Sequence, residues 1–219
     1  MKQLKPLGQR GLFIVLYGPN NIGKSVQIRE LSSRIIQTGK LVMSAKYPIY
    51  HLGKTGPKID TILRRPYRLK RKYSELELQK LFAENRQEFQ DIVIEILNHG
   101  INLIAEDYTG TGIAWGMTRE IPLETLEKIN ANLIKPDLAI LLAGKRFASG
   151  KEAGHRNEDD SDSIWKKNCE IHYQLGKKYN WITVNANQDI PQVHAEIWKI
   201  VVPMLNMEKS TQFPILFKK

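Results

Sequence analysis

The chain has 219 residues, 42% of them hydrophobic and 26% charged, which is typical of one globular domain and too polar for a membrane protein. Its single cysteine, Cys169, excludes an intramolecular disulfide and favours a cytoplasmic location. The formal net charge of +10 predicts an anionic partner, either a polyanion or the phosphate groups of a small molecule.

The first predicted element is a buried strand over residues 12–17 (LFIVLY), a continuous apolar run of the kind found in parallel sheets. Apolar residues then recur at helical spacing over 23–37, and Gly39 stands where that helix is expected to end. Between them lies GPNNIGKS, residues 18–25, which fits the pattern G-x-x-x-x-G-K-[ST]. This strand–loop–helix context indicates a phosphate-binding loop rather than an incidental glycine turn.

The loop predicts a site for a nucleoside triphosphate with Mg²⁺. Glycines let the backbone N–H groups surround the phosphates, and the positive end of the following helix faces them. We expect Lys24 to bridge the β- and γ-phosphates and the Ser25 hydroxyl to ligate Mg²⁺. The predicted ATP-binding residues are Gly18, Asn20, Asn21, Ile22, Gly23, Lys24, Ser25 and Val26.

Further along the chain, predicted strands and helices alternate. Strands are expected over 41–45, 101–105, 138–142 and 181–184, and helices over 74–99, 123–132, 163–179 and 193–205. Two segments, 64–72 and 143–162, show no regular pattern. The alternation predicts an α/β fold of the three-layer P-loop NTPase type, a five-stranded parallel sheet flanked by helices. We expect a single kinase domain over 1–206 and a C-terminal tail over 207–219.

Five segments of the chain resemble the thymidylate kinase family. In chain order they are YGPNNIGKS, LFAENRQE, LIAEDYTGTGIAWG, KPDLAILL and KRFASGKEAGHRNED, and the last matches the family's arginine-bearing lid, here about 143–162. The resemblance covers nearly the whole chain. It implies ATP-dependent phosphorylation of a deoxynucleoside monophosphate, dTMP to dTDP, for deoxynucleotide synthesis. It further implies a homodimer. No membrane partner is expected because the chain is too polar, and the positive charge alone does not require nucleic acid as a partner.

The segment LFAENRQE resembles the helix that lines the family's monophosphate pocket. There a phenylalanine stacks on the pyrimidine and an arginine hydrogen-bonds the base edge, which implies these roles for Phe82 and Arg86. Residues four apart share one helix face, so an apolar plate and a planar donor lie side by side. Periodicity alone favours a core position for Phe82 and a solvated Arg86, whereas the resemblance favours the pocket.

Residues after the second and third predicted strands complete the implied acceptor site. The resemblance assigns acceptor contacts to Lys46, Tyr47, Pro48, Thr111 and Trp115. Lys46 is the candidate for the acceptor phosphate, while Thr111 and Trp115 are equally compatible with ordinary packing. Gly53 and Lys54 resemble a turn that precedes the family's next helix.

The chain departs from the family directly after its third predicted strand. Where the family has Asp-Arg-Tyr, this sequence has Glu106-Asp107-Tyr108. Glu106 keeps a carboxylate for Mg²⁺, but Asp107 replaces the arginine that grips the acceptor phosphate. Two like charges at contact repel by about 1 kcal/mol in water and by several times more in a sheltered cleft. Asp107 therefore points elsewhere, or ligates the metal, or the acceptor phosphate is held by a different cation.

Cations are available elsewhere for that task. In the lid, Arg146 and then Arg156 are the predicted catalytic cations, which with Lys24 and Glu106 make up the expected catalytic set. Arg64, at the start of the basic run 64–72 (RRPYRLKRK), is a candidate replacement for the family's arginine. The rest of that run is typical of a solvated surface.

Two alternatives remain open from the sequence. The altered Glu106-Asp107 pair is compatible with a kinase of the same fold that acts on another nucleotide or a small acceptor. A nucleotide-binding pseudokinase that contacts nucleic acid through the basic run is the non-enzymatic alternative, although the intact Lys24-Ser25 pair and the lid arginines argue against it.

Overall fold

The computed structural model describes residues 2–69, 72–147 and 161–207. Five parallel strands form one sheet in the order β2-β3-β1-β4-β5. They are β1 (Phe13–Tyr17), β2 (Val42–Lys46), β3 (Asn102–Glu106), β4 (Leu138–Ala143) and β5 (Ile182–Asn185). Each predicted strand is confirmed to within two residues, and so is the five-stranded parallel sheet.

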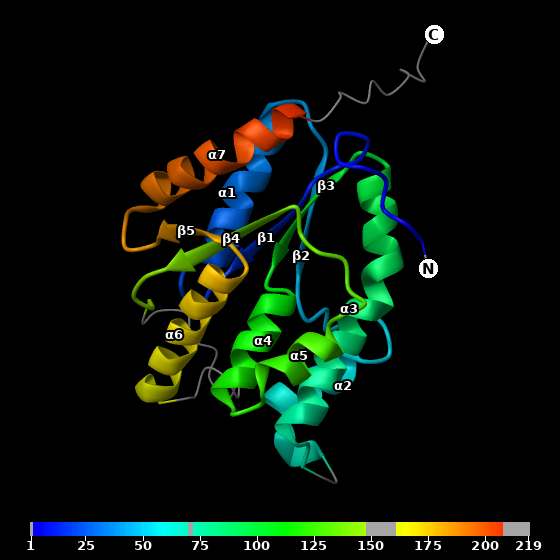
Figure 1. Cartoon of the computed structure of the whole chain (residues 1–219), viewed down its shortest axis with the longest axis vertical. Coiled ribbons are helices and arrows are strands. Elements are labelled where there is room, and N and C mark those ends of the chain that lie inside the picture. The colour runs from blue at the N-terminus through cyan, green and yellow to red at the C-terminus, as the bar shows by residue number, and fades with distance from the viewer. Residues whose placement is uncertain (1, 70–71, 148–160, 208–219) are drawn as a thin grey trace.

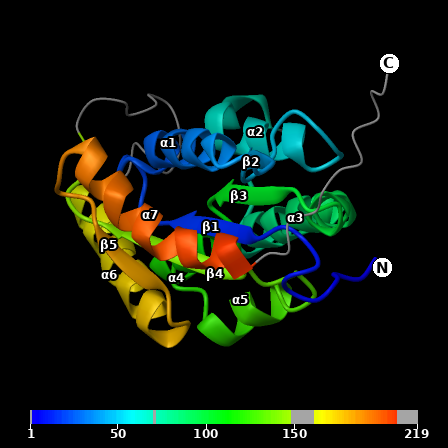
Figure 2. The same cartoon turned by 90° about the horizontal axis from the view of Figure 1, so that it is seen from above.

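Helices cover both faces of this sheet and give the predicted three layers (Figures 1 and 2). The helices are α1 (Lys24–Gln37), α2 (Gly56–Arg64), α3 (Glu75–Asn98), α4 (Thr109–Thr118), α5 (Leu123–Ile129), α6 (Asp162–Lys178) and α7 (Ile190–Met207). On one face, α1 and α7 pack against each other and on the sheet. On the other face, α3 contacts β3 and α6 contacts β4, with α4 packed against both helices.

The central strand β1 is buried on both sides because its residues alternate between two cores. Ile14 and Leu16 pack with the apolar faces of α1 and α7. Phe13, Val15 and Tyr17 pack on the opposite face, toward α3. Full burial of one such side chain contributes about 1.5–3 kcal/mol, so β1 holds the loop that follows it on a rigid support.

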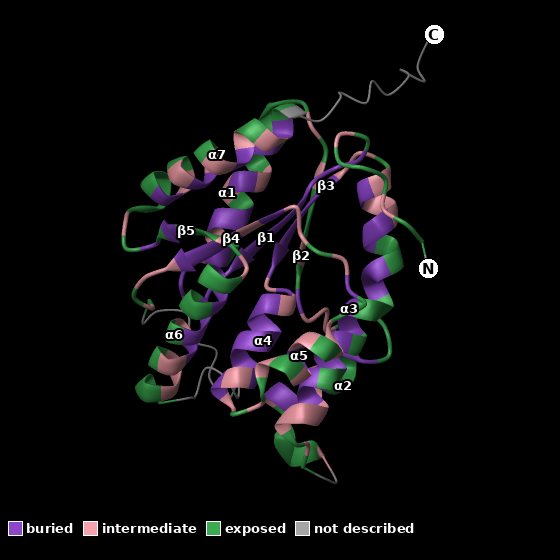
Figure 3. Cartoon of the chain, in the orientation of Figure 1, coloured by how far each residue is buried: buried purple, intermediate pink, exposed green. Residues whose placement is uncertain are grey.

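Two helices were not assigned from the apolar pattern. Helix α4 (TGTGIAWGMT) contains three glycines, which disfavour a helix by about 1 kcal/mol each, but almost all of its residues are buried (Figure 3). Helix α2 is only nine residues long, and its apolar face packs on α3 in a small cluster of its own. Tertiary packing therefore stabilises both helices more than local propensity does.

The segment 64–72 was expected to be irregular throughout, and this was partly wrong. Helix α2 ends at Arg64, and Pro66–Arg68 form one turn of 3₁₀ helix. The cause is the proline, which begins a helical turn easily but cannot continue the preceding helix. Most of the expected lid, residues 148–160, and the tail beyond 207 lie outside the described residues. Within the described ranges, no helix is long and apolar enough to cross a membrane.

Candidate active site

The loop after β1 turns back sharply before it enters α1. Gly18 and Gly23 adopt φ angles of +141° and +96°, and Asn21 lies at +62°. A Cβ atom on Gly18 would lie 2.7 Å from the Leu142 carbonyl oxygen, so both space and φ require glycine there. The loop thereby leads into the N-terminus of α1, where unpaired N–H groups and the helix dipole favour an anion.

Lys24 lies folded over this loop. Its Nζ donates hydrogen bonds to the carbonyl oxygens of Gly18 and Pro19, at 2.8 and 2.9 Å. The side chain is buried, and its Nζ lies 3.5 Å from Asp107 Oδ1. The charge of Lys24 is therefore held between the loop and the end of β3.

Glu106, the last residue of β3, lies between the ends of the two neighbouring strands, β1 and β2. In the register of the sheet it pairs with Leu16 of β1 and Lys46 of β2. Its carboxylate accepts a hydrogen bond from Ser25 Oγ at 2.7 Å and lies 2.8 Å from Lys46 Nζ. Burial opposes ionisation of Glu106, but Lys46, Ser25 and Lys24 outweigh it and lower its pKa, so the carboxylate is charged at neutral pH.

The Ser25–Glu106 pair fits a magnesium ion. It brings one hydroxyl and one carboxylate oxygen to the same point beside the phosphate loop, and Ser25 is exposed, which leaves room for water. Mg²⁺ characteristically takes one or two protein oxygens and completes its shell with water and phosphate oxygens. In the described ranges no cluster of three or more acidic, histidine or cysteine side chains forms a closed metal cage.

Asp107 is turned into the site rather than away from it. Its backbone is left-handed, with φ +62°, and its Oδ1 accepts a hydrogen bond from Thr111 Oγ1 at 2.8 Å. Burial raises the pKa of Asp107, Lys24 opposes this shift and Glu106 adds to it. Of the three explanations for its charge, the one in which Asp107 points elsewhere is therefore wrong.

The opposite end of the site is aromatic and contains Arg86 of α3. The Arg86 side chain is buried, so the interpretation from periodicity that it is solvated was wrong. Its Nη1 donates to Asn130 Oδ1 at 3.0 Å, and its guanidinium lies 5.9 Å from the centre of the Tyr108 ring. Helix α4 passes so close that a Cβ on Gly112 would lie 2.6 Å from Arg86 Nη2. A glycine at this position therefore allows the arginine to fit.

Phe82 and Tyr47 complete this end. Phe82 belongs both to the cluster between α2 and α3 and to the wall of the cavity, so the core and pocket interpretations are each correct in part. Tyr47 donates its backbone N–H to the Glu106 carbonyl at 2.9 Å, and the peptide bond to Pro48 is cis. Burial raises the pKa of Tyr47 to about 12, so its phenol stays neutral.

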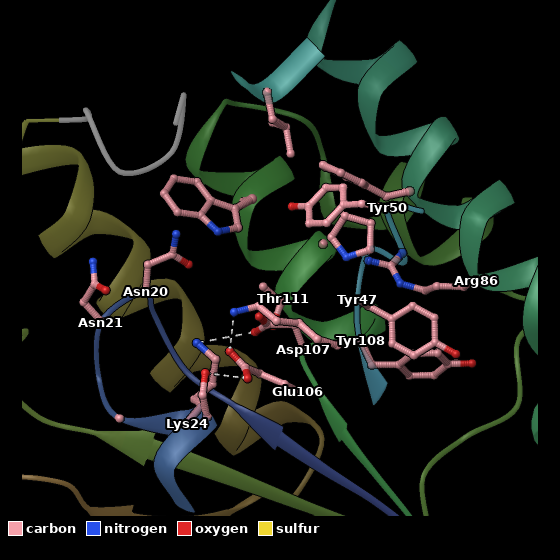
Figure 4. Close-up of a pocket in the computed structure, with 18 of the residues that line it drawn as sticks. Asn20, Asn21, Lys24, Tyr47, Tyr50, Arg86, Glu106, Asp107, Tyr108 and Thr111 are labelled. Carbon is pink, nitrogen blue, oxygen red and sulfur yellow. Dashed lines mark hydrogen bonds and ion pairs between the residues drawn. The ribbon is translucent and has the colours of Figure 1, made fainter. Parts of the chain in front are cut away.

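One cavity of about 250 Å³ connects the two ends. Figure 4 shows Lys24, Glu106 and Asp107 together on one side, and Arg86 with Tyr47 and Tyr108 on the other. The predicted site residues that line it are Asn20, Asn21, Gly23, Lys24, Ser25, Lys46, Tyr47, Pro48, Phe82, Arg86, Glu106, Asp107, Thr111 and Trp115. Residues far apart in the sequence thus share one space.

Some predicted residues lie elsewhere. Ile22 is packed in the core beneath the loop, and Gly18 and Val26 do not line the cavity. Arg146 also lies outside the described lining, with its Nη2 3.9 Å from Asp162 Oδ1 and its guanidinium 5.8 Å from the Trp165 ring centre. Arg156 lies outside the described residues.

Several lining residues were missed by sequence analysis. They are Tyr50, Leu63, Tyr108, Gly112 and Phe147. Phe147 is placed by a hydrogen bond from its N–H to the Asn21 carbonyl at 2.8 Å, which fastens the base of the lid segment to the phosphate loop. Only tertiary contacts bring these residues to the cavity, although the adjacency of Tyr50 to Lys46-Tyr47-Pro48 and of Tyr108 to Asp107 is a local signal.

Comparison with known proteins identifies relatives over the same span. A family model described as thymidylate kinase matches residues 16–197. The chain is 29% identical to a thymidylate kinase of Dictyostelium discoideum, covering 90% of this chain and 87% of the relative. It is 28% identical to the thymidylate kinase of Homo sapiens, with coverage of 86% and 89%. A solved thymidylate kinase structure from Candida albicans superposes with a TM-score of 0.77 at 22% identity, covering 91% of this chain and 94% of that one, which shows the shared fold.

Proposed function

The chain belongs to the thymidylate kinase family, whose members transfer the γ-phosphate of ATP to dTMP, and we propose that the cavity between the phosphate loop and α3 carries out this transfer. The observation that carries the proposal is the shared cavity itself. The phosphate loop lies at one end and a buried arginine among aromatic rings at the other, and residues of both ends line the same cavity.

At the donor end, Lys24 and the loop backbone bind the triphosphate. Lys24 releases its contacts with the loop carbonyls in part and meets the β- and γ-oxygens, while the N-terminus of α1 faces the phosphates. Ser25 and Glu106 would hold Mg²⁺, which when bound would neutralise phosphate charge. Arg146, which lies outside the described lining near Asp162, and Arg156, which lies outside the described residues, are our proposed lid cations for the migrating group.

At the acceptor end, Phe82 stacks on the pyrimidine and Arg86 hydrogen-bonds its edge. The Arg86 Nε is buried without a hydrogen-bond partner among the described residues, so a ligand atom that accepts from it gains a charge-assisted hydrogen bond. Tyr47, Pro48, Thr111 and Trp115 shape the walls around the nucleoside. A nucleotide whose base is held here directs its 5′-phosphate toward Lys46, Asp107 and the phosphate loop.

A coupled assay of ADP release with each nucleoside monophosphate tests this function. We expect dTMP to be the preferred acceptor, with transfer dependent on Mg²⁺. Turnover of another acceptor without turnover of dTMP would favour the altered-acceptor kinase. ATP binding without any transfer would favour the pseudokinase and contradict the proposal.

We also propose that the enzyme is a homodimer, as the family resemblance implies. Light scattering coupled to size-exclusion chromatography tests this, because one chain has a mass of 25.2 kDa. A mass of about one chain at the concentrations used for the assay would contradict it.

A further inference from the structure

Four cations line the described part of the cavity, and each of them already has a partner in the protein. Lys24 lies on the phosphate loop, Arg86 serves the base end, and Lys46 pairs with Glu106. The two lining carboxylates, Glu106 and Asp107, lie where two phosphate groups must meet. Because Asp107 adds negative charge there, an acceptor phosphate needs a further cation. The fourth lining cation is Arg64, whose carboxylate partner Asp60 does not line the cavity, whereas Glu106, the partner of Lys46, does.

Arg64 is the last residue of α2 and is held in place from two sides. Its guanidinium lies 4.2 Å from the centre of the Tyr50 ring, a stacking distance. Its Nη1 donates to Asp60 Oδ1 at 2.9 Å, one helical turn earlier. A guanidinium carries five N–H donors in a rigid plane, so fixing that plane also fixes the direction of the donors that meet a phosphate.

Tyr50 connects Arg64 to the reacting end of the cavity. Figure 4 shows its ring projecting into the cavity across from Lys24 and Asp107. Burial raises the pKa of the Tyr50 phenol, while Arg64 and Lys46 lower it and Asp107 raises it, so all three charges act on the same hydroxyl group. Arg64, Lys46 and Asp107 also line the same cavity as Tyr50.

We propose that Arg64 binds the phosphate of the acceptor, and that Tyr50 and Asp60 are positioning residues that orient its guanidinium. The charge then comes from the end of α2, because position 107 carries a carboxylate. The inference rests on the proposed function, since it assigns the acceptor phosphate within that site.

The neighbouring Arg65 gives a matched control. It also belongs to the basic run and its Nη2 lies 4.0 Å from Asp60 Oδ2, but it is half exposed and does not line the cavity. Arg64→Gln and Arg65→Gln remove the same charge one residue apart. Steady-state kinetics with dTMP and ATP, and calorimetric binding of dTMP and of thymidine, which lacks the phosphate, separate their effects.

For Arg64→Gln we expect KM and Kd for dTMP to rise about 10- to 100-fold, because one or two charge-assisted hydrogen bonds are lost. The Kd for thymidine and the KM for ATP stay within about twofold. Arg65→Gln leaves all four values within about twofold. Arg64→Lys, which keeps the charge without the planar fork, recovers part of the dTMP affinity.

The inference is overturned if Arg64→Gln binds dTMP as wild type does, or if it weakens thymidine as much as dTMP, which is the mark of a structural role. Should Arg64→Gln not fold, Arg64→Lys decides, since wild-type affinity for dTMP in that variant contradicts a bidentate contact. A wild-type enzyme that does not use dTMP contradicts the proposed function instead. Normal use of dTMP by wild type and Arg64→Gln alike contradicts only the role of Arg64.

Discussion

The donor end and the acceptor end of the cavity are built in different ways. The donor end comes from one continuous segment, the loop 18–25, whose function lies in its backbone conformation and in Lys24. The acceptor end takes side chains from the end of β2, from α2, α3 and α4, and from the residues after β3. A backbone cradle tolerates little change, whereas a set of side chains from separate elements can exchange one cation for another.

The pair Asp107 and Arg64 illustrates this difference. At position 107 the chain carries a carboxylate, fixed by Thr111 and Lys24, while a stacked arginine lies on α2 within the same cavity. The loop 18–25, by contrast, keeps every residue type that its pattern requires. Variants that separate donor from acceptor effects therefore test the division directly.

The largest effect is expected from Lys24→Met at the donor end. It removes the cation that we propose meets the β- and γ-phosphates, so we expect kcat to fall by about 100- to 1000-fold, the range for loss of one preorganised charge contact. Thymidine binding, which depends on the other end, stays near wild type. Kinetics with saturating dTMP and calorimetry with thymidine measure the two. A variant that loses thymidine binding as well would show that the ends are not separable.

Arg86→Gln is expected to have the next largest effect, at the base end. Since we propose that the buried guanidinium contacts the base, we expect the affinities for dTMP and thymidine to fall together, by about 10- to 100-fold. The KM for ATP changes by less than about threefold. This pattern differs from that of Arg64→Gln, which affects dTMP alone. A loss of affinity confined to dTMP would indicate that Arg86 contacts the phosphate and not the base.

Much of the fold could be predicted because local pattern and tertiary structure agree. The run 12–17 is apolar throughout and β1 is buried on both faces, and the loop motif carries its own geometry. Helix α4 could not be found in this way, because its glycines disfavour a helix and only packing against α3, α5 and α6 stabilises it. The burial of Arg86 could not be predicted for a related reason, since it depends on the absence of a side chain at Gly112, a residue 26 positions away.

Asp107→Asn is expected to give a smaller effect with the opposite sign. Removing a negative charge beside the acceptor phosphate lowers the KM for dTMP by about three- to tenfold, provided that the hydrogen bond from Thr111 is kept. Burial raises the pKa of Asp107 in the folded protein above its pKa of about 3.8 in the unfolded chain. The contribution of this group to stability is therefore full below about pH 3.8 and declines as pH rises through the pKa of the folded protein.

The stability of Asp107→Asn tests whether the ionised Asp107 carboxylate destabilises the fold at neutral pH. Its melting temperature is expected to exceed that of wild type at neutral pH, by about 2–4 °C for each kcal/mol recovered, and the gain should vanish near pH 4. A lower melting temperature at neutral pH would show that the pairing of Asp107 with Lys24 outweighs its burial.

The smallest effect on activity is expected at His172, in α6 behind the donor loop. Burial lowers its pKa to about 3, so it is neutral in the fold and protonated in the unfolded chain below about pH 6.5. Stability is therefore lost as pH falls, by up to about 1.4 kcal/mol per pH unit from this group. His172→Leu should flatten the decline in melting temperature between pH 6.5 and 4, with unchanged kinetics at pH 7.5. An unaltered decline would contradict this.

The most direct test of the division between the two ends is a crystal structure with dTMP and a non-hydrolysable ATP analogue. We expect the analogue's phosphates on the loop and Lys24, the base between Phe82 and Arg86, and the dTMP phosphate within about 3.2 Å of Arg64 nitrogens. A dTMP phosphate bound by Lys46 or a lid arginine, with Arg64 making no contact with it, would contradict the assignment. A base found away from Phe82 and Arg86 would contradict the acceptor site as a whole.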